Sequence, residues 1–214
     1  MPQSIQLVCL DLGGVLIRVC RDWREACEAA KLELPRPVFD PEMVRGLVEI
    51  NRRHESGRMD DAAFEREAAA LTGLTPQQIA AAAAGWLGPV YPGAFDLVGR
   101  LAAAQPRVRS ACLSNTNTRH WRMMNTPGPH HLGLERLTYR FVSFELGHMK
   151  PSAEIFRDVE RLAGLPPASI LFFDDNPDNV AAARACGWNA ERIDPDGDSP
   201  RQVLEHLGRY EVTL

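Results

Sequence analysis

Hydrophobic residues in this chain fall into short uninterrupted runs, separated by segments in which polar and apolar residues are mixed. Such runs are typical of strands buried on both faces of a parallel sheet, and the mixed segments are typical of the helices that connect them. We therefore predict an α/β fold with a parallel sheet at its core. The runs lie at 5–11, 108–114, 140–144 and 169–174, with a weaker one at 189–193.

The part of the chain between Leu16 and Tyr91 has a different pattern. It shows no strand signal and contains instead four segments of helical character. Asp60 and Thr75 stand at the expected starts of two of them, as helix-capping residues do. The segment that follows, 88–93, contains two glycines and two prolines, as a hinge would. The four predicted helices are Asp22–Lys31, Pro41–His54, Asp60–Leu71 and Pro76–Leu87.

These patterns predict two structural units. Residues 1–17 and 89–214 form a Rossmann-like core, and residues 18–88 form a small all-helical domain inserted after the first strand. With 214 residues, of which 45% are hydrophobic and 24% charged, the chain can bury one good core and a small accessory domain. Open parallel sheets bind their ligands beyond the carboxyl ends of the strands, so we expect the site there.

Charge and cysteine content narrow the classes of function. The net charge is −4, the isoelectric point is about 5.9, and the 24 Lys and Arg residues are spread along the chain, which argues against a nucleic-acid partner. No run reaches the ~18 apolar residues that a membrane span needs. Residues 1–6 carry no basic stretch ahead of a long apolar one, so we expect a cytoplasmic location. Five cysteines without CxxC spacing indicate neither a disulfide framework nor a zinc site.

One acidic residue stands where a parallel sheet would bind its ligand. Asp11 ends the first apolar run and is followed closely by Gly13 and Gly14. At a strand end before a glycine turn, its carboxylate is expected to face a crevice with backbone N–H groups nearby, which suits a phosphate group. Taken alone this signal is not specific, because an aspartate at a strand end often only caps a turn.

Three further segments make the pattern specific. Ser114 ends the second run and Asn115 follows it, Lys150 precedes a proline at an expected helix start, and Asp174 ends the fourth run with Asp175 directly after it. In this order the four segments resemble the four motifs of the haloacid dehalogenase superfamily, and the helical insertion resembles its mobile cap. The resemblance covers nearly the whole chain. The Asp-Leu-Gly start resembles the branch that contains an α-D-glucose 1-phosphate phosphatase.

The resemblance implies a reaction and a role for each residue. It implies a Mg²⁺-dependent phosphatase of small phosphorylated metabolites, which we expect to be sugar phosphates, with an aspartyl-phosphate intermediate on Asp11. Asp11, Ser114 and Lys150 would form the catalytic set, and Ser114, Asn115 and Lys150 would bind the phosphate. Oxygen atoms are the ligands that Mg²⁺ prefers. The implied metal ligands are Asp11, the backbone carbonyl of Gly13, Asp174 and Asp175.

One position departs from the superfamily pattern. Its phosphatases usually carry a second aspartate two residues after the nucleophile, which protonates the leaving oxygen and later activates water, and here that position is Gly13. An anomeric oxygen is a good leaving group and depends less on such a donor. Alternatively the insertion supplies the acid. His54 and Glu55, in the expected turn between the second and third inserted helices, resemble the loop that reaches into the site in related enzymes, so we expect them to contact the substrate or to replace the acid.

Two other functions fit part of the pattern. A 2-haloacid dehalogenase would share Asp11, Ser114 and Lys150, but that chemistry needs no metal and leaves the acidic pair 174–175 unexplained. The missing acid would also suit a catalytically weakened domain that binds a phosphorylated ligand or a protein partner. The sequence leaves the oligomeric state and the extent of cap closure open.

Overall fold

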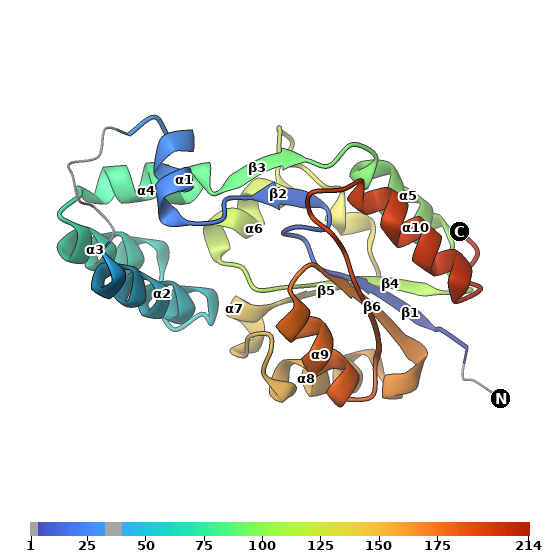
Figure 1. The fold of residues 1–214 in the computed structure, drawn as a ribbon. Helices are drawn as coiled ribbons and strands as arrows, with labels where there is room; N and C mark the ends of the chain where they lie inside the picture. The colour runs from blue at the N-terminus through green and yellow to red at the C-terminus, as the bar shows by residue number, and fades with distance from the viewer. Residues whose placement is uncertain (1–3, 33–39) are drawn as a thin grey trace.

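A five-stranded parallel sheet forms the centre of the molecule (Figure 1). The computed structural model describes residues 4–32 and 40–214. The strand order is β5-β4-β1-β6-β7 and every neighbouring pair is parallel, which confirms the predicted α/β core. The strands are β1 (Leu7–Leu10), β4 (Arg109–Ser114), β5 (Tyr139–Val142), β6 (Ile170–Asp174) and β7 (Asn189–Arg192).

Helices cover both faces of this sheet (Figure 1). They are α5 (Ala94–Ala103), α6 (Thr118–Asn125), α7 (Ser143–Leu146), α8 (Ala153–Ala163), α9 (Pro177–Ala185) and α10 (Ser199–Arg209), with 3-10 helices at Leu134–Arg136 and Pro167–Ser169. Val8 and Leu10 of β1 join the hydrophobic core beneath α5 and α10, whereas Leu7 and Cys9 join the core beneath α8 and α9. Because both faces are buried, β1 reads in the sequence as a continuous apolar run.

The inserted segment folds as four helices, as predicted, with an apolar cluster of its own. The helices are α1 (Trp23–Ala29), α2 (Pro41–Glu55), α3 (Asp61–Thr72) and α4 (Pro76–Gly85), and together they are called the cap below. Leu47, Phe64 and Ile79 from three of these helices meet in the cluster. Asp60 and Thr75 accept hydrogen bonds from the first-turn N–H groups of α3 and α4, so both predicted helix starts are confirmed.

An antiparallel ribbon joins the cap to the core, although the sequence predicted no strand between Leu16 and Tyr91. Its strands are β2 (Ile17–Val19) and β3 (Leu87–Val90) (Figure 1). The prediction was wrong because β2 is only three residues long and β3 contains a glycine and a proline, which are depleted in strands. The expected domain boundaries fall inside this ribbon, and the division into core and cap stays a proposal.

Polar contacts from α6 and α7 hold the cap over the carboxyl ends of the strands. Ser143, the first residue of α7, donates its hydroxyl to the carbonyl oxygen of Glu55 at 2.6 Å. The expected strand 140–144 ends at Val142, and this turn into α7 brings Ser143 to the cap. The contacts from α6 are Thr118 Oγ1 to Asp61 Oδ1 (2.9 Å), Arg119 to Glu65 and to the carbonyl of Ala80 (3.0 Å), and His120 Nε2 to the carbonyl of Ala83 (2.7 Å).

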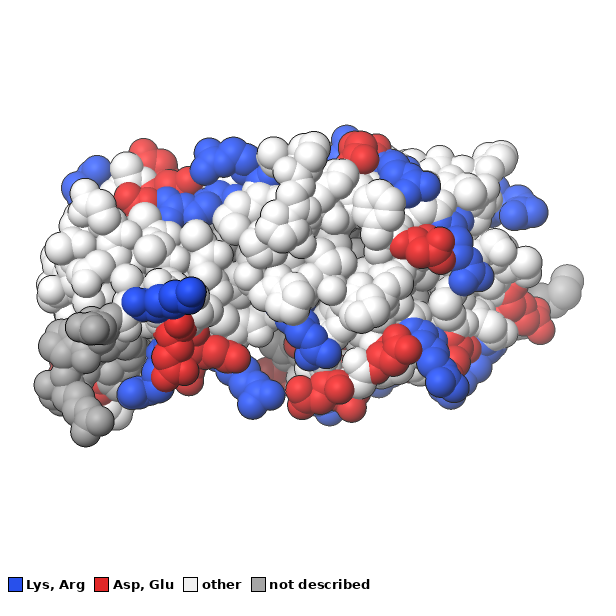
Figure 2. Space-filling view, turned by 90° about the horizontal axis from the view of Figure 1, so that it is seen from above, with Lys and Arg blue, Asp and Glu red and all other residues white. Residues whose placement is uncertain are grey.

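The distribution of charge on the surface does not indicate a nucleic-acid partner. On the face shown in Figure 2, basic and acidic side chains are interspersed around a broad uncharged area. The absence of a nucleic-acid partner stays a prediction. Within residues 4–32 and 40–214, the helices are all too short or too polar to cross a bilayer.

Gly57 offers a test of how tightly the cap is docked. A Cβ atom at Gly57 would lie 2.1 Å from the carbonyl oxygen of Phe144 in the core, and its φ is +72°. Gly73 has a φ of +73° but no described atom within 4 Å of such a Cβ. We expect Gly73→Ala to cost only the backbone strain of about 1–2 kcal/mol. Gly57→Ala should lower the melting temperature further and make the ribbon between cap and core easier to cleave by protease; equal effects of the two variants would contradict this.

Candidate active site

Asp11 stands at the carboxyl end of the central strand, beneath the cap. Its N–H donates to the carbonyl of Phe173 at 2.8 Å, which extends the sheet pairing by one residue and fixes the direction of the side chain. Oδ1 accepts from the N–H of Leu12 at 2.7 Å and lies 2.9 Å from Nζ of Lys150. One carboxylate oxygen is therefore held in place, and Asp11 keeps 8% of its surface exposed.

Lys150 connects the predicted motifs in space. Its Nζ lies 2.9 Å from Asp11 Oδ1 and donates to Asp174 Oδ2 at 2.7 Å and to the carbonyl of Leu113 at 2.8 Å. The side chain of Asn115 makes two hydrogen bonds to the main chain of Lys150: Nδ2 donates to the Lys150 carbonyl, and Oδ1 accepts from the Lys150 N–H, both at 2.9 Å. The sequence assigned Asn115 to the phosphate. The structure commits its amide to Lys150, and we now propose that Asn115 positions the lysine.

The two acidic residues that follow β6 have different surroundings. Asp174 is fully buried and, besides the ammonium group, accepts hydrogen bonds from the N–H of Asn176 (2.9 Å) and from Nδ2 of Asn179 (3.0 and 3.1 Å). Asp175 is half-buried and lies against Gly14, where a Cβ would come within 2.4 Å of its carboxylate. We therefore propose that Asp175 is a metal ligand and that Asp174 acts chiefly by holding the lysine.

The site carries more negative than positive charge. Burial raises the pKa of Asp11 to about 7, against the opposing effect of Lys150, and Asp174 adds to the rise. Burial also raises the pKa of Asp175, with Asp174 again adding to it. Burial disfavours the charged form of Lys150, but Asp11 and Asp174 outweigh it and raise the lysine pKa. Three carboxyl groups thus share one ammonium group, and a second cation would relieve the imbalance.

The residues present fit a magnesium ion. Oxygen atoms of Asp11, Asp174 and Asp175 lie within 4.8 Å of one another. This oxygen-only set suits a hard cation such as Mg²⁺, whereas zinc is usually bound through imidazole or thiolate groups. Gly14 leaves space beside Asp175 that any larger residue would fill. The carbonyl of Gly13 belongs to the same turn and stays a predicted ligand.

Ser114 ends β4, the strand next to β1, and the loop after it leads directly into α6. Because Cys112 pairs with Leu10, Ser114 stands level with the turn that follows Asp11. The loop is held at both ends: the N–H of Thr116 donates to Ser143 Oγ at 2.9 Å, and Asn117 caps α6. A contact between the Ser114 hydroxyl and a phosphoryl oxygen stays a prediction.

The sequence predicted that His54 and Glu55 lie in a turn. The structure shows instead that they are the last two residues of α2. His54 is 3% exposed, its Nε2 lies 2.8 Å from Asp61 Oδ1, and its ring stacks on Phe64 with a centroid distance of 4.5 Å. Burial lowers its pKa. The structure therefore places His54 inside the cap and does not bring it to the expected substrate position. Glu55 points the other way, into a pocket.

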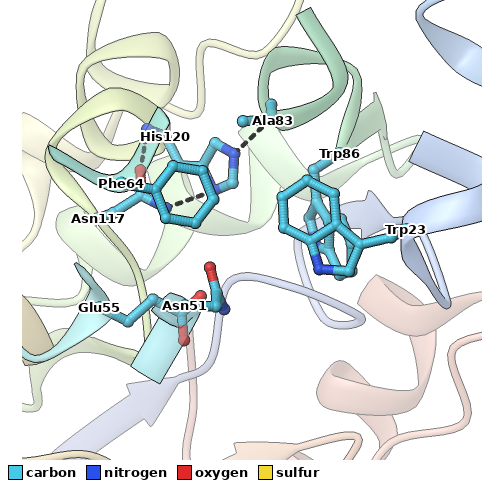
Figure 3. A pocket seen from close by; sticks show the side chains of 8 residues that line it. All are labelled: Trp23, Asn51, Glu55, Phe64, Ala83, Trp86, Asn117 and His120. Carbon is cyan, nitrogen blue, oxygen red and sulfur yellow. Dashed lines mark hydrogen bonds between the residues drawn. The ribbon is translucent and has the colours of Figure 1, made fainter. Parts of the chain in front are cut away.

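This pocket, with a cavity volume of about 20 Å³, lies between the cap and the loop after Ser114 (Figure 3). One wall is aromatic, with the rings of Trp23 and Trp86 5.3 Å apart and Trp23 stacked on Phe64 at 5.9 Å. The remaining wall is mostly polar. The lining residues are Trp23, Asn51, Glu55, Phe64, Ala83, Trp86, Asn117 and His120.

Some site residues were missed by the sequence analysis. Ser143 had a signal, since it is a hydroxyl residue at the end of an apolar run on the same edge of the sheet, but it was counted as part of the strand. Asn117 precedes a helix and has the pattern of an N-cap. Asn179, Trp23 and Trp86 had no distinguishing signal, because their place in the site depends on how α9 and the cap pack against the core.

Comparison with known proteins places this geometry in a family. The model of the haloacid dehalogenase-like hydrolases matches residues 5–187. A phosphoglycolate phosphatase of Chromobacterium violaceum is 26% identical over 198 residues, covering 88% of this chain and 84% of that protein. A haloacid dehalogenase family enzyme of Bacteroides thetaiotaomicron, in complex with magnesium and inorganic phosphate, has a TM-score of 0.73 at 25% identity, covering 91% of this chain and 97% of that one. An L-2-haloacid dehalogenase of Xanthobacter autotrophicus shares the fold with a TM-score of 0.60 at 17% identity, covering 99% and 85%.

The matched range includes the cap and all four motifs. It begins before β1 and ends after α9, so it contains Asp11, Ser114, Lys150, Asp174 and Asp175. The geometry agrees, because the structure gathers these five residues at one edge of the sheet. The chain belongs to the haloacid dehalogenase-like hydrolases.

Proposed function

We propose that the protein is a Mg²⁺-dependent phosphatase of small phosphorylated metabolites that works through an aspartyl-phosphate on Asp11. The observation that carries this proposal is the cluster of three carboxyl groups, of which Asp11 and Asp174 are paired with the ammonium group of Lys150. A divalent cation and a phosphoryl group together match that charge pattern. The phosphatase name of the Chromobacterium violaceum relative, and the magnesium and phosphate in the Bacteroides thetaiotaomicron structure, support the same conclusion.

The chain's own residues can carry both steps. Asp11 attacks phosphorus with a carboxylate oxygen, the bond to the leaving oxygen breaks, and water then cleaves the aspartyl-phosphate. The N–H of Leu12 and the Lys150 ammonium hold Oδ1, which leaves the second oxygen to attack. Lys150 and the hydroxyl of Ser114 stabilise the phosphoryl oxygens. Because the ammonium is fixed by three contacts before substrate binds, little reorganisation is needed in the transition state.

The metal would be held on the exposed side of the carboxylate cluster. Asp11, the carbonyl of Gly13 and Asp175 would be its ligands, with Asp174 behind them. When bound, Mg²⁺ supplies the positive charge that lets a carboxylate approach a phosphate anion. Without it, the excess negative charge of the site repels the substrate.

The pocket supports a leaving group that is a single ring with hydroxyl groups, as in a sugar phosphate. Trp23 and Trp86, whose rings are tilted by 56° to each other, offer apolar faces for such a ring, and Asn51 and Glu55 offer hydrogen-bonding groups for its hydroxyls. The cavity volume is about 20 Å³ with the cap docked, which is room for about one water molecule, so the cap must move outward to admit a ring of this size.

Phosphoglycolate is the second candidate substrate, favoured by the name of the Chromobacterium violaceum relative. Its short leaving group would leave the aromatic wall unused. Dehalogenation shares the fold and would use the same nucleophile, but it gives no role to Asp175 or to the excess of negative charge.

Replacing the nucleophile tests the reaction type. Asp11→Asn should lower the rate of p-nitrophenyl phosphate hydrolysis in Mg²⁺ by more than about 1000-fold, because no covalent intermediate can form. Its circular dichroism spectrum should match that of the wild type, because Asp174 and the carbonyl of Leu113 still pair with Lys150. Asp175→Asn should mainly raise the Mg²⁺ concentration needed for half-maximal rate. Asp178→Asn, at an exposed position of α9, serves as the control. Wild-type turnover by Asp11→Asn would refute the mechanism.

Replacing the aromatic wall tests the substrate class. Trp86→Ala should reduce kcat/KM for glucose 1-phosphate about 10-fold through the lost stacking, while Trp86→Phe retains most of it. Activity on phosphoglycolate, which has no ring, should change little in either variant. A parallel loss on both substrates, or faster wild-type turnover of phosphoglycolate than of any sugar phosphate, would count against a ring-shaped leaving group.

A further inference from the structure

We propose that Glu55 is the general acid of this enzyme: it protonates the leaving oxygen from the cap, because position 13 has no side chain to do so from the core. The proposal rests on the phosphatase activity proposed above. Of the described residues that line the pocket, Glu55 and His120 are the two with titratable side chains. These two are therefore the candidate proton donors that the pocket itself offers.

His120 is excluded by its contacts. Its Nε2 donates to the carbonyl of Ala83 at 2.7 Å, and its Nδ1 lies 3.2 Å from Nδ2 of Asn117, which donates to it. Both ring nitrogens are thus engaged and the tautomer is fixed. Burial lowers the pKa of His120 to about 4, so the ring is neutral near pH 7. Its role is to join α6 to the cap.

Glu55 stands at the end of α2 that contacts the core. Its carbonyl oxygen accepts from Ser143 Oγ at 2.6 Å, which anchors the end of α2 to the core. Its side chain enters the pocket, whose core side is formed in part by Asn117 (Figure 3). The charge of Lys150 acts on the Glu55 carboxyl group, and Lys150 Nζ is itself 2.9 Å from Asp11. A leaving oxygen that departs from phosphorus toward the pocket moves toward Glu55.

The surroundings of Glu55 also favour the protonated form. Burial raises its pKa to about 7, and the side chain of Asn51 and the charge of Lys150 offset part of that rise. The carboxyl group sits at the C-terminal end of α2, where the helix dipole disfavours negative charge. Across the pocket His120 is neutral. Among the described groups that act on Glu55, Lys150 is the one cation, so the carboxyl can hold its proton near neutral pH and release it as the leaving oxygen becomes basic.

The protons balance over the two steps. As Asp11 forms its bond to phosphorus, the bond from phosphorus to the leaving oxygen breaks and that oxygen takes the Glu55 proton, so the product leaves as an alcohol. The Glu55 carboxylate then accepts a proton from the water that attacks the aspartyl-phosphate. Inorganic phosphate is released, and both carboxyl groups return to their starting states.

Leaving-group dependence tests this role in the Mg²⁺-loaded enzyme. Phenyl phosphate and p-nitrophenyl phosphate have similar shapes, but the phenyl leaving oxygen is more basic and needs a proton more. We expect Glu55→Gln, which keeps the shape of the side chain, to lower kcat on phenyl phosphate at least about 10-fold more than on p-nitrophenyl phosphate. The decline of the wild-type rate above pH 7 should be lost in the variant. Glu49→Gln, on the exposed face of α2, should change neither.

The outcomes separate this inference from the function on which it rests. If the wild type hydrolyses neither ester in Mg²⁺, the phosphatase proposal itself fails. If it hydrolyses both and Glu55→Gln slows them equally or not at all, the phosphatase stands and Glu55 is not the acid. Equal slowing would assign Glu55 to substrate binding alone.

Stability measurements check the buried carboxyl without any activity assay. The folded-state pKa of Glu55 lies above its ordinary value of 4.5, at about 7, so the unfolded chain loses this proton first as the pH rises. The contribution of Glu55 to the free energy of unfolding is therefore most favourable below pH 4.5, and it declines between pH 4.5 and 7. Glu55→Gln should gain stability relative to the wild type across that interval. An unchanged difference across it would show that Glu55 is not buried as a neutral acid and would contradict the proposal.

Discussion

The buried ammonium group of Lys150 is the interaction on which the rest of the site depends. A charge removed from water is stable only if its partners are close and well placed. Here they are Asp11, Asp174 and the carbonyl of Leu113, which stand at the ends of β1, β6 and β4. The lysine thus ties three strands together at the catalytic edge. The contacts that keep the buried ammonium group stable therefore also hold these strand ends, and the site residues on them, together.

The charged residues of the site could be predicted because each stands where an apolar strand ends, and parallel strands bring those ends to one edge. The hydrogen-bond and ion-pair partners of these residues could not be predicted. Asn115 and Asp174 were assigned to phosphate and metal because the sequence does not show that their polar groups already hold Lys150. His54 was assigned to the substrate because its packing against Phe64 is a tertiary contact with no local signal.

The same division applies to the fold. Buried strands and capped helices carry local signals of periodicity and end residues, and these predicted the sheet and the four cap helices. The β2–β3 ribbon is a pairing between distant segments with poor strand propensity, so only the folded chain reveals it. Helix ends are weakly encoded, and α2 extends to Glu55 where a turn was expected. A rigid helix, rather than a loop, therefore carries Glu55 to the pocket.

The loop that carries Ser114 continues without a break into α6, whose first residues, Thr118 to His120, bind the cap. With the role proposed for Ser114, one short segment takes part both in holding the phosphoryl group and in holding the cap. Binding energies that share a rigid element are coupled in both directions, so a ligand that orders the loop tightens the cap, and a docked cap raises the affinity for the ligand. The same coupling between ligand binding and cap docking applies to the phosphate product. Its departure requires the cap to loosen, so the release of phosphate is coupled to the opening of the cap.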